Sequence, residues 1–321
     1  MSRVLDEYYR EPLNTRDDSP WSLLHWSIAY GVDATVAVGG PSGRQVTAIG
    51  WLCCNYPAAG KQMIEMRGRE WSLPIAPGLQ GHDAQFLAML AQSRVSRGYV
   101  VRVGGEERRV ADLVEFEKRT CRSGQELTFK LTGLAHYEGT DARWNNARGE
   151  AWSVERILDE ELSAPIGRYD ATCGGVHRLF AISYAVELRR SEGGTFTRLY
   201  KRAEDRVQQY QKRALSMQNS DGSFSTAWLD NAEQRGDETR RLLTTGHVLE
   251  WLVFSLPDEE LEDDKVQRAV AFVCRTLEGR SGEEWHPGAL GHALHALAIY
   301  EQRVLGVEPG QRSSSSGLRP E

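Results

Sequence analysis

The sequence contains few cysteines and no long apolar run. Its 321 residues include five cysteines, an odd number, and Cys53 and Cys54 are adjacent. This count does not fit a disulfide framework, and free cysteines usually behave as small buried hydrophobes. No stretch approaches the about 18 apolar residues of a membrane-spanning helix. The first residues lack the apolar segment of a secretory signal. We therefore expect a reduced, soluble, cytoplasmic chain, although an exported fragment cut after its signal has the same appearance.

An excess of positive charge is also absent. The chain has 39 lysines and arginines against 45 acidic residues, a net charge of −6. Such a balance does not displace counterions from phosphates, which argues against a nucleic-acid partner. The sequence also lacks the motifs Gly-x4-Gly-Lys-Ser/Thr, Gly-x-Ser-x-Gly and His-Glu-x2-His. It therefore offers no P-loop, hydrolase nucleophile elbow or zinc-protease helix.

Helical periodicity dominates what is present. Segments 153–162, 202–218 and 263–278 each carry one apolar stripe and a charged back, which is typical of surface helices. Other segments are apolar nearly all round and must be covered on every side: 21–30, 84–91, 126–137, 179–188, 248–256 and 293–300. This alternation predicts an all-α fold, an α/α toroid whose complete or incomplete ring holds about five to six helical hairpins.

Short strands are expected only where glycine-rich turns interrupt an alternating pattern. We expect a hairpin of Thr35–Val38 with Gln45–Ile49, and another of Tyr99–Val103 with Arg108–Val110. Both are predicted to decorate the connections between helices.

The chain divides into one large domain with two end segments. Residues 1–17 are assigned as an N-terminal extension and residues 18–306 as the toroid domain. Residues 307–321 include four consecutive serines and little to bury, so they are predicted to be a disordered tail.

A Gly-His repeat singles out candidate functional residues. In each of its three close copies a second polar residue follows the histidine by three positions, which gives the pairs His82/Gln85, His247/Glu250 and His292/His295. Residues three apart share a helix face, and a buried polar group left unpaired costs about 1–3 kcal/mol. We therefore expect the pairs to begin inner helices and converge on a polar cavity. Helix N-termini there would favour an anionic ligand group.

Each of these residues also has a plainer explanation. Glycine and histidine can simply end a helix, with the imidazole bonded to a neighbouring loop. Under the functional hypothesis, acid–base catalysis falls to His82, His247, Glu250 and His292. Ligand contacts fall to Gln85, His177, His295 and Trp144. Trp144 lies in a polar loop, where it is either a ligand contact or a loop anchor.

A resemblance to a known family enters at the motif Gln218-Asn-Ser-Asp-Gly-Ser-Phe224. It is similar to the repeat of prenyltransferase β subunits and squalene cyclases, where a helix ends in Gln and Gly-x-aromatic precedes the next inner helix. Glu278–Trp285 resembles a degenerate copy. The resemblance covers about Arg202 to Tyr300. The whole chain also resembles a group of bacterial proteins that carry such repeats and have no assigned activity.

The resemblance implies a toroid, an isoprenoid-like ligand and a zinc site. Family members hold zinc with Asp-x-Cys and a later His, which maps onto Asp170, Cys173 and His247, with His177 as a substitute. Here one extra residue separates Asp170 from Cys173. The Asp-x-Asp-Asp motif of the cyclases and the Asp-Asp-x2-Asp motif of chain-elongating prenyl synthases are both absent.

Two classes of function remain open. In the first, the toroid binds or transforms a small-molecule or lipid-like ligand, either isoprenoid-like or a sugar acid with an anionic end. In the second, it is a non-catalytic repeat scaffold that binds a protein partner. An open cavity favours the first class, and a lumen filled by side chains favours the second.

Overall fold

The structure is mostly helical. It is a computed structural model that describes residues 1–68, 70–166, 173–309 and 312. Those residues contain twelve α-helices: α1 (Ser2–Arg10), α2 (Pro20–Tyr30), α3 (Ala48–Cys53), α4 (Gln85–Gln92), α5 (Val110–Arg119), α6 (Thr128–Glu138), α7 (Val154–Ser163), α8 (Val176–Ser191), α9 (Arg198–Ser216), α10 (Glu238–Ser255), α11 (Asp264–Leu277) and α12 (Pro287–Leu305). Two 3₁₀ turns, η1 (Gly31–Asp33) and η2 (Asp258–Glu260), follow α2 and α10. The predicted all-α class is confirmed at this level.

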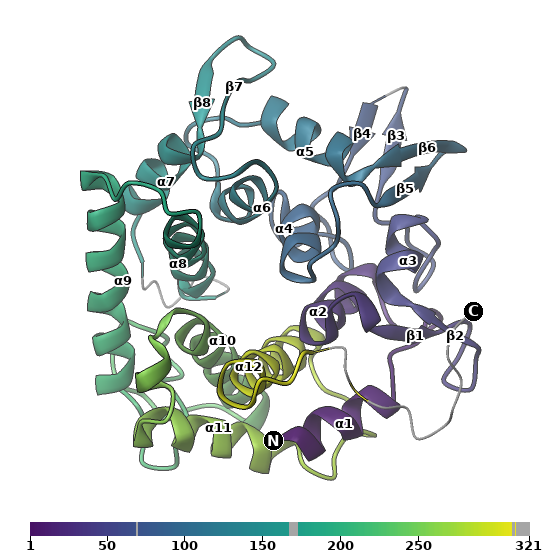
Figure 1. The fold of residues 1–321 in the computed structure, drawn as a ribbon. Coiled ribbons are helices and arrows are strands. Elements are labelled where there is room, and N and C mark those ends of the chain that lie inside the picture. The colour runs from purple at the N-terminus through teal and green to yellow at the C-terminus, as the bar shows by residue number, and fades with distance from the viewer. Residues whose placement is uncertain (69, 167–172, 310–311, 313–321) are drawn as a thin grey trace.

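The even-numbered helices form an inner set. Each of α2, α4, α6, α8 and α10 contacts the next even-numbered helix, and α12 contacts α2 in turn. Figure 1 shows these helices nearly end-on around a common centre, with α5, α7, α9, α11 and α1 outside them. The arrangement follows from composition, because the inner helices are buried on almost all sides while the outer helices bury one stripe.

The helix caps agree with the local sequence. Ser19 accepts a hydrogen bond from the Ser22 amide and precedes Pro20 at the first position of α2. Asp237 caps α10 in the same way, through the amide of Arg240. Such caps satisfy amides that have no partner inside the helix. The six segments predicted as inner helices all lie wholly or largely within observed inner helices.

The predicted starts of α10 and α12 are wrong. His247 and His292 were expected to begin helices, but α10 starts at Glu238 and α12 at Pro287. Gly246 and Gly291 therefore lie inside helices. A Cβ on Gly291 would come within 2.6 Å of His25 Cβ, and one on Gly246 within 2.9 Å of the Ala293 nitrogen. These glycines allow neighbouring inner helices to approach closely instead of ending a helix.

Four two-stranded antiparallel sheets decorate the connections among the described residues. The two predicted hairpins are confirmed, and two others, each with three-residue strands, were not predicted because their alternation is too short to detect. The pairs are β1 (Thr35–Ala37) with β2 (Gln45–Thr47), β3 (Glu65–Arg67) with β4 (Glu70–Ser72), β5 (Val100–Val103) with β6 (Glu106–Arg109), and β7 (Arg143–Asn145) with β8 (Ala151–Ser153).

The Gln218–Phe224 turn joins one outer helix to the next. The Gln218 amide donates to the carbonyl of Lys265, and the Phe224 amide donates to Thr245 Oγ1 on α10. Gly222 has φ +93°, and a Cβ there would lie 2.3 Å from the Arg268 carbonyl oxygen. The turn thus needs glycine, and it attaches α9 to both α11 and α10.

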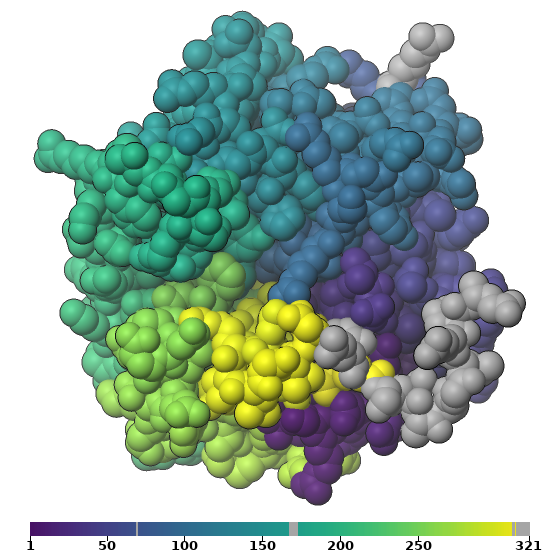
Figure 2. All heavy atoms as spheres, in the orientation of Figure 1, coloured from purple at the N-terminus to yellow at the C-terminus, as the bar shows by residue number. Residues whose placement is uncertain are grey.

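The first helix packs against the last helix. The segment assigned as an N-terminal extension contains α1, which contacts α12 and buries Val4, Leu5 and Tyr8. Figure 2 shows the yellow C-terminal helix beside the purple N-terminal segment. The predicted tail lies mostly outside the described residues; within it, Glu308 pairs with Arg94. Every helix in the described residues is too short or too polar to span a membrane.

Candidate functional site

Five histidines from different inner segments gather in what we call the histidine cluster: His25, His82, His177, His247 and His292. The ring centroids of His247 and His292 are 3.7 Å apart, and those of His177 lie 5.0 and 5.1 Å from them. His82 and His25 extend the cluster, at 5.4 Å from His177 and 5.2 Å from His292. Imidazoles from separate hairpins therefore come together as expected, but they pack against one another and do not line the cavity.

A carboxylate holds two of the histidines. Glu250 Oε2 lies 2.7 Å from Nδ1 of His292, and its Oε1 lies 2.5 Å from Nδ1 of His295. Glu250 is 3% exposed, so both contacts are shielded from water. Burial raises the pKa of the Glu250 carboxyl, but the charge and hydrogen bonds of His292 and His295 outweigh it and hold that pKa well below its usual range.

Two other members of the cluster also have fixed rings. Nδ1 of His247 lies 2.8 Å from the Leu243 carbonyl, and Nδ1 of His25 lies 2.7 Å from the Trp21 carbonyl. A carbonyl only accepts, so Nδ1 carries the proton and Nε2 keeps its lone pair. Burial lowers the pKa of His25, His247 and His292, which favours neutral imidazoles.

Cys173 and His177 behave as a coupled pair beside the cluster. Burial raises the pKa of the Cys173 thiol, but the adjacent His177 outweighs it and brings that pKa to about 6. Burial lowers the pKa of His177, and Cys173 more than offsets this, so the net shift is upward. His177 Nδ1 is buried without a hydrogen-bond partner in the described part of the chain. Asp170 lies outside the described residues, so the zinc set that includes it cannot be built.

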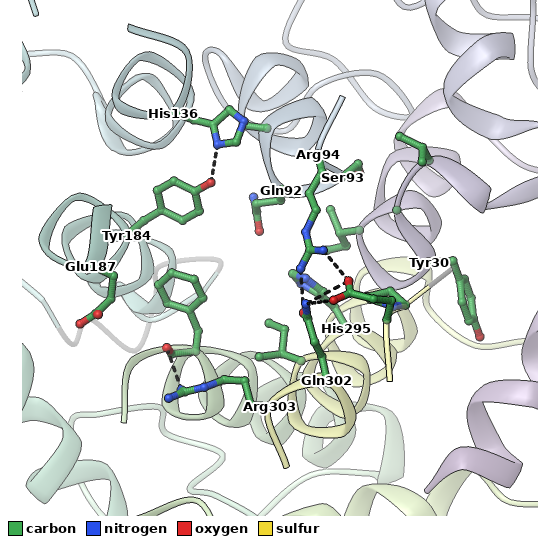
Figure 3. A pocket seen from close by; sticks show the side chains of 18 of the residues that line it. Tyr30, Gln92, Ser93, Arg94, His136, Tyr184, Glu187, His295, Gln302 and Arg303 are labelled. Atoms are coloured by element: carbon green, nitrogen blue, oxygen red, sulfur yellow. Dashed lines mark hydrogen bonds and ion pairs between the residues drawn. The ribbon is translucent and has the colours of Figure 1, made fainter. Parts of the chain in front are cut away.

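A cavity of about 850 Å³ opens at the other end of the inner helices. Its wall includes Phe180, Tyr184 and Phe254, and the rings of Tyr184 and Phe254 stack with 5.5 Å between centroids. In Figure 3 most of the labelled side chains surround a hollow, and the Tyr184 hydroxyl bonds to Nδ1 of His136 at 2.7 Å. Aromatic rings therefore form one part of the wall, and polar or charged side chains such as Gln92, Glu187 and Gln302 form much of the rest.

The cluster and the cavity occupy two levels of the same helices. On α2, α8 and α12 a cavity residue follows the cluster histidine by three positions, as Phe180 follows His177. Because the cluster histidine precedes the cavity residue on each of these helices, the three helices run in the same direction. The cavity therefore lies at their C-terminal ends, opposite to the N-terminal location expected from the sequence.

His295 connects the two levels. It lines the cavity, and its Nδ1 contacts the carboxylate that also holds His292. Of the described residues that the sequence predicted as cavity lining, His295 alone contacts this cavity. His247 and His292 are packed in the cluster, and His82 lies at its edge, where its Nδ1 is 2.8 Å from Glu126 Oε2.

Two predicted ligand contacts have structural roles instead. The Gln85 side-chain oxygen accepts from the Gly81 amide at 2.7 Å and closes the turn before α4. The Trp144 indole donates to the Lys118 carbonyl at 3.0 Å, on the β7–β8 hairpin outside the inner helices (Figure 1). Trp144 is thus a loop anchor, the alternative that the sequence left open.

The sequence analysis missed most residues of the cavity wall. Tyr184, Phe254 and Ile299 each follow a cluster histidine by seven positions, a spacing that returns to the same helix face two turns later. They were counted as core because the helices are apolar all round. The histidine spacing was the available signal.

Comparison of the chain with protein-family models, curated proteins and solved structures finds no significant match. The residues and their geometry therefore carry the functional argument.

Proposed function

We propose that the chain is an α/α toroid that binds a small molecule with an extended apolar body in the cavity at the C-terminal ends of its inner helices. The closed cycle of contacts from α2 to α12 and back supports the toroid. The Gln218–Phe224 turn, which ties successive helices together, supports it as well. The resemblance to prenyltransferase and cyclase repeats makes an isoprenoid-like body the leading candidate.

The aromatic cavity wall carries the ligand proposal. A volume of about 850 Å³ lies within the range of sites for small organic molecules. Phe180 and Phe254 face each other with 4.7 Å between ring centroids, and Ile28 and Ile299 add aliphatic wall. Such a surface gains most by excluding water against hydrocarbon. A sugar acid could bond to the polar part of the lining, such as Gln92, His136 and Gln302, but it would leave this apolar part uncovered.

Electrostatics favour a ligand whose polar end is neutral or cationic. Helix C-termini carry partial negative charge, and the inner helices present theirs at this cavity. The two arginines in the lining are already engaged: Arg94 pairs with Glu308, and Arg303 pairs with Asp258 and donates to the Leu256 carbonyl. An anionic end would have to compete for them.

His295 is the residue positioned to act on such a ligand. Glu250 holds its Nδ1, which leaves Nε2 free to exchange a proton at the cavity floor. A carboxylate that orients an imidazole in this way is a familiar arrangement for general acid–base catalysis. His247, His292 and Glu250 support this position from behind instead of contacting the ligand.

Three ligands with one hydrocarbon test the proposal: farnesol, farnesylamine and farnesyl diphosphate. We expect the alcohol and the amine to bind with about 1:1 stoichiometry in calorimetry, and the diphosphate to bind at least about tenfold more weakly. Tighter binding of the diphosphate would overturn the charge argument and restore the anionic end expected from the sequence. Absence of binding by all three would overturn the proposal and favour the protein-binding scaffold.

A further inference from the structure

The centre of the histidine cluster has the composition of a metal site. His177 on α8, His247 on α10 and His292 on α12 each offer one ring nitrogen, and these three atoms lie within 4.8 Å of one another. Imidazole nitrogens are common ligands of zinc and of other first-row transition metals. Three inner helices thus bring three nitrogen ligands to one point.

Hydrogen bonds to Nδ1 orient two of these rings and leave the lone pair on Nε2. Glu250 holds Nδ1 of His292 and the Leu243 carbonyl holds Nδ1 of His247, so both rings keep an unprotonated Nε2. Metal-bound histidines almost always have their second nitrogen held by a carboxylate or a carbonyl in this way. Two of the three rings therefore already carry the outer contacts of metal ligands.

The third ring approaches the second closely. Nε2 of His177 lies 3.3 Å from the acceptor Nε2 of His292, so in the absence of a cation it donates a hydrogen bond there. Nδ1 of His177 is buried and has no hydrogen-bond partner within the described residues. A dication between the rings would replace the proton shared by the two Nε2 atoms. Two nitrogens that each lie about 2.0–2.1 Å from a tetrahedral zinc are about 3.3–3.4 Å apart, close to the distance observed.

We propose that His177, His247 and His292 together bind one transition-metal dication, with zinc as the best match. Three imidazoles leave a fourth tetrahedral position for water or another ligand. Glu250 orients His292 and belongs to the outer shell. The set shares only His247 with the one implied by the family resemblance, which uses the Cys173 sulfur instead of His292. It also does not depend on which molecule fills the cavity.

Cobalt provides the direct test, because Co²⁺ replaces zinc and reports its ligands by absorption. The full-length chain is stripped with a chelator and titrated with Co²⁺. We expect one equivalent to bind, with the intense visible bands of a four-coordinate site and without a sulfur-to-metal charge-transfer band. Zinc should then displace the cobalt. Sub-stoichiometric binding by the wild-type chain, or a strong sulfur band that Cys173→Ala removes, would overturn the three-histidine assignment.

Variants separate the ligands from their neighbours. His247→Ala and His292→Ala should weaken Co²⁺ binding by more than the ~10–100-fold typical of losing an outer-shell partner. His136→Ala, at a half-buried histidine outside the cluster, and Cys173→Ala should retain the metal. Equal binding by His292→Ala and His136→Ala would contradict the proposal. Should the cluster variants fail to fold, the wild-type chain still decides through its cobalt spectrum and through the rise of its Tm with added zinc.

Discussion

The inner helices form two different environments along their length: the histidine cluster and, nearer their C-terminal ends, the cavity. At the histidine level the helices are in close contact, as where Gly291 of α12 meets His25 of α2, and the Glu250 carboxylate pairs with two imidazoles. At the cavity level aromatic side chains and polar side chains together line a hollow of about 850 Å³. The histidine level is packed like a core but contains polar side chains, whereas the cavity level encloses space that the side chains of the described residues leave unfilled.

This difference indicates which level is sensitive to substitution and which level has room for an organic ligand. A buried polar network must be fully satisfied or it destabilises the fold, so the histidine level tolerates little change. An aromatic wall facing a hollow makes fewer contacts, so its side chains can be altered at lower cost and are available to a ligand. The comparison therefore predicts that substitutions at the two levels have separable effects.

The largest effect is expected for Glu250→Gln at the histidine level. A glutamine amide has one acceptor oxygen, so it cannot accept from both His292 and His295 as the carboxylate does. We expect a loss of about 2–3 kcal/mol in the free energy of unfolding, measured by urea denaturation. The matched control is Glu126→Gln, which removes the carboxylate that holds His82 at the edge of the cluster, where it is 37% exposed. That control should cost less than about 1 kcal/mol. Equal losses would mean that the network at Glu250 is not special.

The helices could be predicted from the sequence because the buried face of a helix determines the spacing of its apolar residues. The all-round apolar composition of 179–188 predicts an inner position for α8, and the apolar stripe of 202–218 predicts an outer position for α9. Hairpins could be predicted only where a glycine-rich turn joins longer alternating segments, so β3–β4 and β7–β8 were missed.

The site was predicted in part, for a related reason. A histidine in an apolar helix is conspicuous, so the cluster was found, whereas Phe254 in the same helix is indistinguishable from core. The role of the glycines was misjudged because Gly246 resembles a helix start in sequence, while the contact that requires it comes from Ala293, far along the chain. Whether a helix face meets a neighbour or a hollow is decided by tertiary packing, which periodicity does not record.

An intermediate effect is expected for Phe254→Ala at the cavity level. The ring stacks on Tyr184 and faces Phe180, so its removal should weaken farnesol binding about tenfold by calorimetry. Its cost in stability should stay below that of Phe272→Ala, since Phe272 is only 6% exposed on the outer helix α11. The Phe272 variant should bind farnesol as the wild type does. A loss of binding in both variants would show that affinity follows overall stability, and the separation of the two levels would fail.

The smallest effect is expected at the cavity mouth, where Arg94→Gln tests the electrostatic half of the argument. Removing this guanidinium leaves Glu308 without its ion pair and makes the mouth more negative. Farnesylamine should then bind about two- to fivefold more tightly relative to farnesyl diphosphate at low ionic strength, and added salt should reduce the change. Arg97→Gln is the matched control, because it alters the net charge equally but removes an ion pair with Glu138, and Arg97 does not line the cavity. If both variants shift the preference equally, the selectivity arises from the total charge of the protein. A shift confined to Arg94→Gln would instead place it at the mouth, where the negative helix ends already favour the amine.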